Sequence, residues 1–497
     1  MGIIVRQSIK STVVNYVGTF IGFLTTVIVA TRWLTDEEIG LTRVLFEAAT
    51  LLACLAQVGI TSSAIRFFPR FKNQGELHNG FFFYLMIIPL IGSLVVVPLY
   101  FLCKELIAGY FQARSSLFVE YIDWLVPLML FLVYLGVFEV YANLLMRIVI
   151  PRFIREVVIR VLIVTVYLLY GFRLIGLTGF VAGYVLTYGV AMALNFWYLS
   201  RITSISLRHD YSSVSLPVRK DFFKYTAFLM IGIVGNGIAS RLDLFMVSGM
   251  LGLASGGIYT IAFFMAAIIE LPSRSITAIS TPIAAEALQA GDFVRANALY
   301  KKVALHQLIA GGFIFLLLWA NIDNAYHLIP NGDDFRAGKW VVFYIGFSRL
   351  IILFLGFGYS LLSFSRYYRW ALYLTLFVFG VTMLSNYLLI PRFGITGAAM
   401  ATLCAVIITY AAQQWLVLAK IKGNPYTRES LVFLLLLVGL FGLNSLLPVA
   451  ESPWADGIYR TAILGVTGGG ALYFFHLSEE IDRLMQRILH YFFIKRD

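Results

Sequence analysis

The sequence predicts an all-α, polytopic membrane protein, and three observations support this fold class. Of the 497 residues, 60% are hydrophobic and only 13% are charged, whereas a soluble domain carries about 25% charged residues. Apolar runs of roughly 20 residues, the length that a helix needs to cross a bilayer, recur along the whole chain. The runs are long and do not alternate between apolar and polar residues, which favours helices over barrel strands.

We expect about 14 membrane-spanning helices, judged by the length that crosses a bilayer. In chain order they cover residues 11–34, 40–66, 79–103, 121–146, 153–171, 176–200, 222–249, 255–283, 302–322, 338–363, 367–390, 395–419, 429–448 and 457–476. Tight turns with the sequences GFRLIGLTG and PRFGITG join the fifth span to the sixth and the eleventh to the twelfth. The first span is too long for the apolar segment of a signal peptide, so we expect it to remain uncleaved.

The loops between the spans alternate in charge. The even-numbered loops and the C-terminal tail are rich in Lys and Arg, whereas the odd-numbered loops hold acids such as Asp36, Asp323 and Glu451. Positive charge collects on the cytoplasmic side of membrane proteins, so both termini are predicted to be cytoplasmic. This asymmetry explains the formal net charge of +12, and we expect no nucleic-acid partner.

The chain contains an internal repeat at an offset of about 217 residues, as many transporters do. The matched positions are Val17 and Val234, Gly18 and Gly235, Ile21 and Ile238, Leu34 and Leu251, Gly40 and Gly257, and Phe46 and Phe263. The segments GLTG (176–179) and GITG (394–397) match at nearly the same offset. The repeat unit has six spans, an even number, so the two copies run parallel through the membrane with a cavity where they meet.

The repeat and the loop charges together predict four parts of the chain. They are a six-helix bundle (1–200), a basic cytoplasmic linker (201–221), a second six-helix bundle (222–421), and two extra spans with a cytoplasmic tail (422–497).

No sequence motif points to catalysis. The chain has neither a G-x-x-x-x-G-K-[ST] nor an H-E-x-x-H motif, which argues against ATP hydrolysis and zinc chemistry. Its three cysteines form no CxxC pair, so they give no redox or zinc signature. We predict no catalytic residue, no metal site and no cofactor.

Ionisable residues within the apolar spans are the candidate functional residues, because a charge in the membrane is costly and usually has a role. Arg43 and Glu47 lie four residues apart on one helix face. They form either a self-satisfying ion pair near the outer interface or a basic group that lines a cavity and is held by its acid. Arg241 and Asp243 are two apart and point to roughly opposite sides of their helix, so each needs a partner elsewhere. Their repeat equivalents in the first span are uncharged, which favours a function.

The eighth and tenth spans hold further charges. Glu270 and Arg274 lie four apart with Pro272 between them, and proline bends a helix, so this segment is either a hinge or a structural ion pair beside a kink. Pro282 marks a second bend or the end of the span. Arg349 lies near mid-depth with no acid within one helical turn, which favours a position that faces a cavity.

Several arginines in a cavity predict an anionic substrate, since arginine binds phosphate through paired, charge-assisted hydrogen bonds. The predicted substrate-binding residues are Arg43, Arg241, Arg274 and Arg349. Acids among them would neutralise the empty cavity or couple transport to a proton or sodium ion. These acids are Glu47, Asp243, Glu270 and Glu139. The alternative for Glu139 is a structural pair with a neighbouring helix.

Five segments of the chain resemble a known family. They are LTDEEIGLTRV (34–44), GITSSAIRFFPRF (59–71), RLDLFMVSGMLGLASGGIYTIAFF (241–264), P…TPIAAEAL (272–288) and GITGAAMAT (394–402). Over nearly its full length the chain is similar to the polysaccharide-transporter branch of the superfamily that also contains multidrug and toxic-compound extruders. Members of that branch include bacterial oligosaccharide flippases.

The resemblance implies a V-shaped pair of six-helix bundles. It implies transport of an undecaprenyl-pyrophosphate-linked oligosaccharide across the bacterial inner membrane by alternating access, for lipopolysaccharide O-antigen, capsule or exopolysaccharide synthesis. Cavity arginines of such relatives contact the pyrophosphate, and by span number Arg43, Arg274 and Arg241 match them. The implied partners are the lipid-linked substrate, the bilayer, a polysaccharide polymerase and a chain-length regulator.

Two alternatives remain open. An ion-coupled multidrug or small-cation antiporter of the same superfamily often has an acidic residue in the first span, and this chain has none between Ser11 and Thr31. A membrane polysaccharide polymerase or ligase would need a large acceptor-binding loop outside the membrane, and the predicted outer loops are short.

Overall fold

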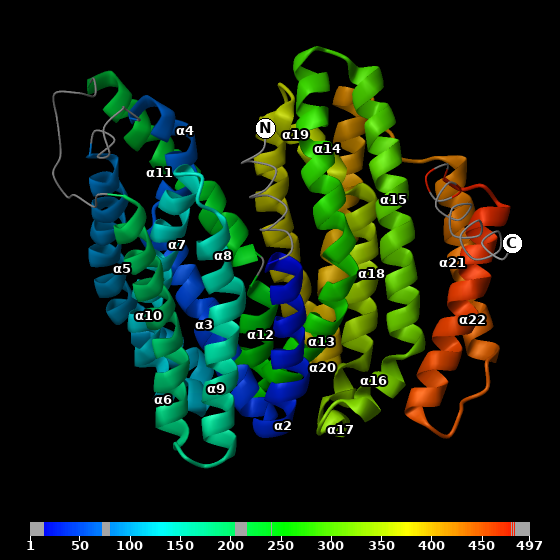
Figure 1. Cartoon of the computed structure of the whole chain (residues 1–497), viewed down its shortest axis with the longest axis horizontal. Coiled ribbons are helices and arrows are strands. Elements are labelled where there is room, and N and C mark those ends of the chain that lie inside the picture. The colour runs from blue at the N-terminus through cyan, green and yellow to red at the C-terminus, as the bar shows by residue number, and fades with distance from the viewer. Residues whose placement is uncertain are drawn as a thin grey trace, which may run out of the picture. The chain divides into compact units, whose positions relative to one another are not determined.

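The computed structural model describes residues 14–71, 80–203, 216–239, 241–478, 480 and 482. Every regular element within these residues is a helix (Figure 1), which confirms the all-α, polytopic fold class. The chain divides into two compact units, Met1–Ile261 (unit 1) and Ala262–Asp497 (unit 2). Residues 204–215 of the predicted basic linker and 483–497 of the predicted tail lie outside the described residues.

Unit 1 opens with the helical span Val14–Trp33. Its elements are η1 (Leu24–Ala30), α2 (Thr31–Trp33), α3 (Asp36–Ala56), α4 (Ile60–Phe71), α5 (Phe81–Gln112), α6 (Ser116–Glu120), η3 (Ile122–Trp124), α7 (Leu125–Leu144), α8 (Val149–Phe153), η4 (Ile154–Val158), α9 (Ile159–Gly171), α10 (Leu177–Ile202), α11 (Leu216–Ala239), α12 (Leu242–Leu251) and α13 (Leu253–Ala267), which continues into unit 2.

Unit 2 is also built from helices and short helical turns. Its elements are η5 (Ile268–Glu270), α14 (Leu271–Gln289), α15 (Phe293–Ala320), α16 (Ile322–Leu328), α17 (Gly332–Phe335), η6 (Arg336–Gly338), α18 (Lys339–Leu355), α19 (Phe357–Phe364), α20 (Tyr368–Ile421), α21 (Arg428–Leu446) and α22 (Pro453–Phe474).

Ten helices of the described residues are long and apolar enough to cross a membrane. One of them, α20, contains two of the predicted spans. Three other predicted spans do not appear among the ten: 153–171 is divided among α8, η4 and α9, 222–249 is divided between α11 and α12, and 457–476 corresponds to α22. The helical stretch 149–171 is continuous, and its charged residues, Arg152, Arg155, Glu156 and Arg160, keep it out of the ten.

The chain reverses direction within α20. Gly394 has φ 61° and ψ −140°, a conformation outside the helical region, and glycine adopts positive φ without a Cβ clash. Lys420 near the end of α20 lies 5.9 Å from the ring of Tyr367, which precedes its start. The two ends are therefore neighbours, and the tight PRFGITG turn predicted between the eleventh and twelfth spans is confirmed.

The start of α3 is fixed by a capping box. The Thr35 hydroxyl accepts a hydrogen bond from the backbone N–H of Glu38, and the Glu38 carboxylate accepts one from the N–H of Thr35 at 2.9 Å. Together these bonds satisfy two N–H groups that a helix start leaves unpaired. The prediction of one continuous second span, 40–66, is wrong, because α3 ends at Ala56 and positive φ at Val58 and Gly59 separates it from α4.

Helices α3 and α13 approach closely at two glycines of unit 1. A Cβ added to Gly40 would lie 2.0 Å from the carbonyl oxygen of Leu253, and one added to Gly257 would lie 1.9 Å from the carbonyl oxygen of Asp36. Gly40 and Gly257 are matched positions of the predicted repeat, and so are Asp36 and Leu253 at the same offset. The contact is thus reciprocal, as it is about a local two-fold axis.

In unit 2, the last two helices pack on α15. Phe433 of α21 is fully buried, and a Cβ added to Gly312 of α15 would lie 2.8 Å from its ring. Leu437, Leu440 and Leu464 extend the same apolar core. The predicted extra spans are therefore packed into unit 2 through an apolar seam.

Candidate functional site

A charged site in unit 1 joins α3 to the start of α12. Glu47 Oε1 lies 2.5 Å from Arg43 Nη2, and Glu47 Oε2 lies 2.5 Å from Arg241 Nε. The Arg241 contact is an ion pair without hydrogen-bond geometry at Nε, while Nη1 donates to the carbonyl of Gly237 at 2.9 Å. Glu47 is only 6% exposed. One buried carboxylate therefore holds two guanidinium groups, and we call these three residues the Glu47 triad.

The position of Arg241 depends on a helix break. The prediction of a continuous seventh span, 222–249, is wrong, because α11 ends at Ala239 and α12 begins at Leu242. Arg241 is the residue before α12, with φ −120°. Broken helices occur in membrane proteins where the segment is buried in protein or lines a cavity. Here the break accompanies the contact of Arg241 with α3.

Asp243 contacts a different element from Arg241, as their spacing predicts. The Tyr259 hydroxyl of α13 donates a hydrogen bond to Asp243 Oδ2 at 3.2 Å. Arg241 and Asp243 thus contact different helices, α3 and α13. Tyr259 was not identifiable from the sequence, because a tyrosine sixteen residues away gives no signal of pairing.

A second charged site lies in unit 2. Arg349 of α18 donates a hydrogen bond from Nη1 to Glu270 Oε1 of η5 at 2.7 Å, and its guanidinium carbon lies 5.0 Å from the ring centroid of Phe263. Arg349 has no acid on its own helix, but its acid partner comes from η5. The Nε of Arg349 is buried and has no hydrogen-bond acceptor among the described residues. A buried donor without an acceptor carries a free-energy cost that a ligand oxygen could remove.

The predicted pair of Glu270 and Arg274 does not form. Glu270 ends the 3-10 turn η5 and precedes α14, so the two residues do not share the α-helical face that a four-residue spacing assumes. Arg274 is exposed and has no ion-pair partner in the described part of the chain. Pro272 lies in the first turn of α14, where a missing N–H costs little, and Pro282 lies inside α14. The hinge role of both prolines stays a prediction.

Glu139 forms the cross-helix pair that was its structural alternative. Its Oε2 on α7 lies 2.6 Å from Nε of Arg155 in the π-helical turn η4. Sequence reasoning did not identify Arg155 as its partner, because the two residues come from different helices.

No group of three or more His, Cys, Asp or Glu side chains in the described ranges could hold a metal ion.

In both charged sites, an anion can replace the carboxylate as the hydrogen-bond acceptor of an arginine. Each places an arginine against a carboxylate, with arginine side chains 20% to 27% exposed. A phosphate oxygen can replace the carboxylate oxygen because both accept the same paired N–H donors. The Glu47 triad places two guanidinium groups on one carboxylate.

Comparison with known proteins supports the fold and the family. Residues 4–286 match the family described as Polysaccharide biosynthesis protein. An uncharacterized membrane protein of Methanocaldococcus jannaschii is 22% identical over 278 residues, and the chain spans about half of that relative's length, 54% of each protein being covered.

Three solved structures share the fold. The lipid II flippase MurJ, in an inward closed conformation, gives a TM-score of 0.71 at 12% identity, with 93% of this chain and 99% of that chain covered. An inward-facing multidrug resistance transporter of the MATE family gives 0.60 at 14% identity, with 83% and 95% covered. A MOP superfamily transporter from Pyrococcus furiosus gives 0.52 at 17% identity, with 85% and 96% covered.

Proposed function

Because the chain belongs to the polysaccharide biosynthesis protein family, we propose that it is a flippase for an undecaprenyl-pyrophosphate-linked oligosaccharide. The observation that carries the proposal is the convergence of Arg43 and Arg241 on the buried Glu47. Two guanidinium groups held side by side suit a pyrophosphate, which offers several oxygens to paired N–H donors. The fold shared with a lipid II flippase supports the same class of substrate.

In this proposal Glu47 is ion-paired with the two arginines until the substrate binds. Its carboxylate neutralises part of their charge in the empty protein, where an unpaired charge is costly. The pyrophosphate then competes for the same donors. Arg349 is a separate candidate donor in unit 2, because its buried Nε has no acceptor among the described residues. Alternating access would carry the pyrophosphate from one side of the membrane to the other.

The finer parts of the proposal follow from the sequence. We place the protein in the bacterial cytoplasmic membrane with both termini cytoplasmic, since basic loops mark the inner side. Glu47 and Glu270 are the acids best placed to couple transport to a proton or sodium ion. The pathway would be O-antigen, capsule or exopolysaccharide synthesis, with a polymerase and a chain-length regulator downstream.

The proposal is tested in a deletion strain that carries single variants. Arg43→Gln and Arg241→Gln should reduce surface polysaccharide and cause lipid-linked units to accumulate on the cytoplasmic side. A charge-assisted hydrogen bond is worth about 1.5–3 kcal/mol, so each variant should weaken substrate binding about ten- to a hundredfold. Lys104→Gln, which removes a partly exposed ion pair with Asp123, is the matched control. Full surface polysaccharide from both arginine variants at normal membrane levels would exclude the proposed site.

The same strain separates the two alternatives. Increased sensitivity to cationic drugs without a polysaccharide defect would identify a multidrug antiporter. Shortened polysaccharide without cytoplasmic accumulation of lipid-linked units would identify a polymerase or ligase.

A further inference from the structure

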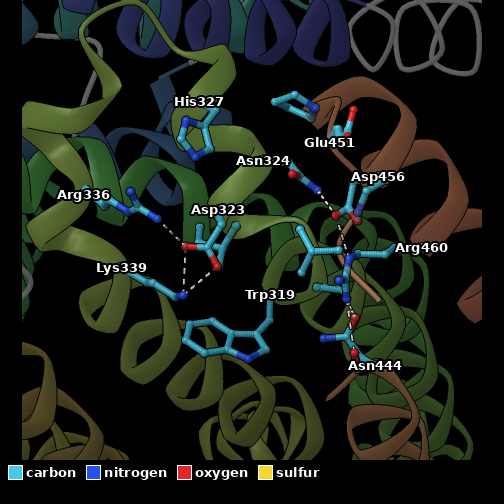
Figure 2. A pocket seen from close by; sticks show the side chains of 15 residues that line it. Trp319, Asp323, Asn324, His327, Arg336, Lys339, Asn444, Glu451, Asp456 and Arg460 are labelled. Atoms are coloured by element: carbon cyan, nitrogen blue, oxygen red, sulfur yellow. Dashed lines mark hydrogen bonds and ion pairs between the residues drawn. The ribbon is translucent and has the colours of Figure 1, made fainter. Parts of the chain in front are cut away.

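A cavity of about 630 Å³ lies at one end of unit 2, and Figure 2 shows the side chains that line it. It is enclosed by the end of α15 at Ala320, the start of α18 at Lys339, the end of α21 at Leu446 and the start of α22 at Pro453. Three of these helices are candidate membrane spans, so the cavity lies where apolar spans end. The loop charges predict that this is the outer side of the membrane. Its volume is in the range of small-molecule sites, about 300–1,000 Å³.

One wall of the cavity is cationic. Lys339 Nζ donates to both carboxylate oxygens of Asp323, at 2.9 Å and 2.7 Å. Arg336 Nη2 lies 3.7 Å from the same carboxylate, and the Arg336 side chain is 50% exposed. One acid is therefore shared by two cations, and the more exposed guanidinium is held weakly. Figure 2 shows both cations beside Asp323 at the cavity wall.

The opposite wall combines a fixed ion pair with one unused acid. Asp456 is 2% exposed and accepts hydrogen bonds from Arg460, Asn324 and the backbone of Ala450 at 2.7–2.8 Å, so its charge is fully used. Glu451 lies on the rim, is exposed, and has no ion-pair partner within the described residues. The cavity thus offers cations on one side and an available carboxylate on the other.

Aromatic and apolar groups surround this charge pattern. Trp319 lines the cavity and packs against Trp340, with ring centroids 5.4 Å apart. Leu446, Val449 and Trp454 beside the cavity are 80%, 81% and 67% exposed. Tryptophan is enriched at the membrane–water interface, and large exposed apolar side chains at this level can contact acyl chains.

We propose that this cavity binds the headgroup of a zwitterionic aminophospholipid. The phosphate lies against Arg336 and Lys339, the ammonium lies against Glu451, and the acyl chains lie on the exposed apolar residues of α21 and α22. Arginine binds phosphate through a planar fork of donors. The ammonium supplies the positively charged partner that the Glu451 carboxylate lacks among the described residues. The site is independent of the substrate that the protein transports.

The test measures lipid binding to the full chain in detergent by native mass spectrometry. Phosphatidylethanolamine and phosphatidylglycerol are titrated separately, because they share the phosphate and differ in the ammonium. Wild type should bind phosphatidylethanolamine at least about fivefold more tightly, a difference of roughly 1 kcal/mol. Arg336→Gln should weaken binding of both lipids, whereas Glu451→Gln should remove the preference and leave phosphatidylglycerol binding intact. Arg428→Gln, at the opposite end of α21, is the control.

Three results would overturn the proposal. The first is equal binding of the two lipids by wild type, and the second is binding unchanged in Arg336→Gln. The third is a preference for phosphatidylethanolamine that survives Glu451→Gln, which would mean an anion site without recognition of the headgroup. Both substituted residues are exposed, so folding is retained, and a size-exclusion profile equal to that of wild type verifies it.

Discussion

Neutralising Glu47 should destabilise the protein by leaving two guanidinium groups facing each other. Glu47→Gln keeps the shape of the side chain and removes the charge that contacts Arg43 and Arg241 at 2.5 Å each. The two arginines then repel each other without the Glu47 carboxylate between them. The damage should be reversed in part by removing one of them.

The magnitude follows from the burial of the triad. Removal of one partner from a buried ion pair costs about 3–5 kcal/mol. The carboxylate is 8% exposed at its side chain, but the guanidinium groups are 27% and 20% exposed, and solvent screens them in part. We therefore expect a loss at the lower end of that range, about 3 kcal/mol. In the double variant Glu47→Gln/Arg241→Gln, one of the two repelling charges is absent, so about half of the lost free energy of unfolding should be recovered.

The assay is a double-mutant cycle read by unfolding in detergent, followed through intrinsic tryptophan fluorescence. The four proteins are wild type, Glu47→Gln, Arg241→Gln and the double variant. Independent sites add within about 0.3–0.5 kcal/mol, so a larger coupling energy is required if the triad is a unit. Additive losses within that range would refute the reasoning, because the carboxylate would then not hold Arg241.

Two further predictions concern packing and pH. Gly257→Ala should lower the free energy of unfolding by about 1–3 kcal/mol, because its Cβ would meet a backbone oxygen at 1.9 Å. Gly439→Ala, whose Cβ would have nothing within 4 Å, should be neutral or stabilising. Equal unfolding temperatures of the two variants in a thermal scan would contradict this contact. The hydrogen bond from Lys302 lowers the pKa of Glu480 to about 2 from its ordinary 4.5, so the attachment of the C-terminal segment should hold above pH 4.5 and weaken as the pH falls towards 2. The mobility of a spin label beside Glu480 measures this, and Lys302→Ala should move the transition to higher pH because it removes the largest cause of the lowered pKa; an unchanged transition in that variant would contradict it.

The sequence was sufficient for features that local chemistry determines. Run length predicted the helical membrane fold, and the glycine of PRFGITG predicted the reversal at Gly394, since only a residue without a Cβ adopts that conformation freely. The two-residue spacing of Arg241 and Asp243 predicted separate partners. The partners themselves were out of reach, because Glu47 and Tyr259 come from other helices and pair through packing.

Two of the breaks in the helices were not predictable from local signals. Neither a proline nor a glycine stands at residues 239–241, where α11 gives way to α12, although kinks usually have such a cause. The 3-10 turn η5 changed the partner of Glu270 from Arg274 to Arg349 by moving the acid off the α-helical register. In both places a small change of backbone geometry selects which arginine meets which acid.

The reciprocal glycine contact and the Glu47 triad together show where the two halves of the chain differ. Gly40 and Gly257 pack in equivalent ways against each other's helices, so the scaffold at this contact is common to both copies of the predicted repeat. The repeat offset places the uncharged Leu24 opposite Arg241, so the second guanidinium of the triad has no counterpart. The shared scaffold offers equivalent positions in both copies, whereas the charge of Arg241 is present in one copy only. The candidate anion site is therefore expected at the positions where the repeat fails, and this is where Arg241 meets Glu47.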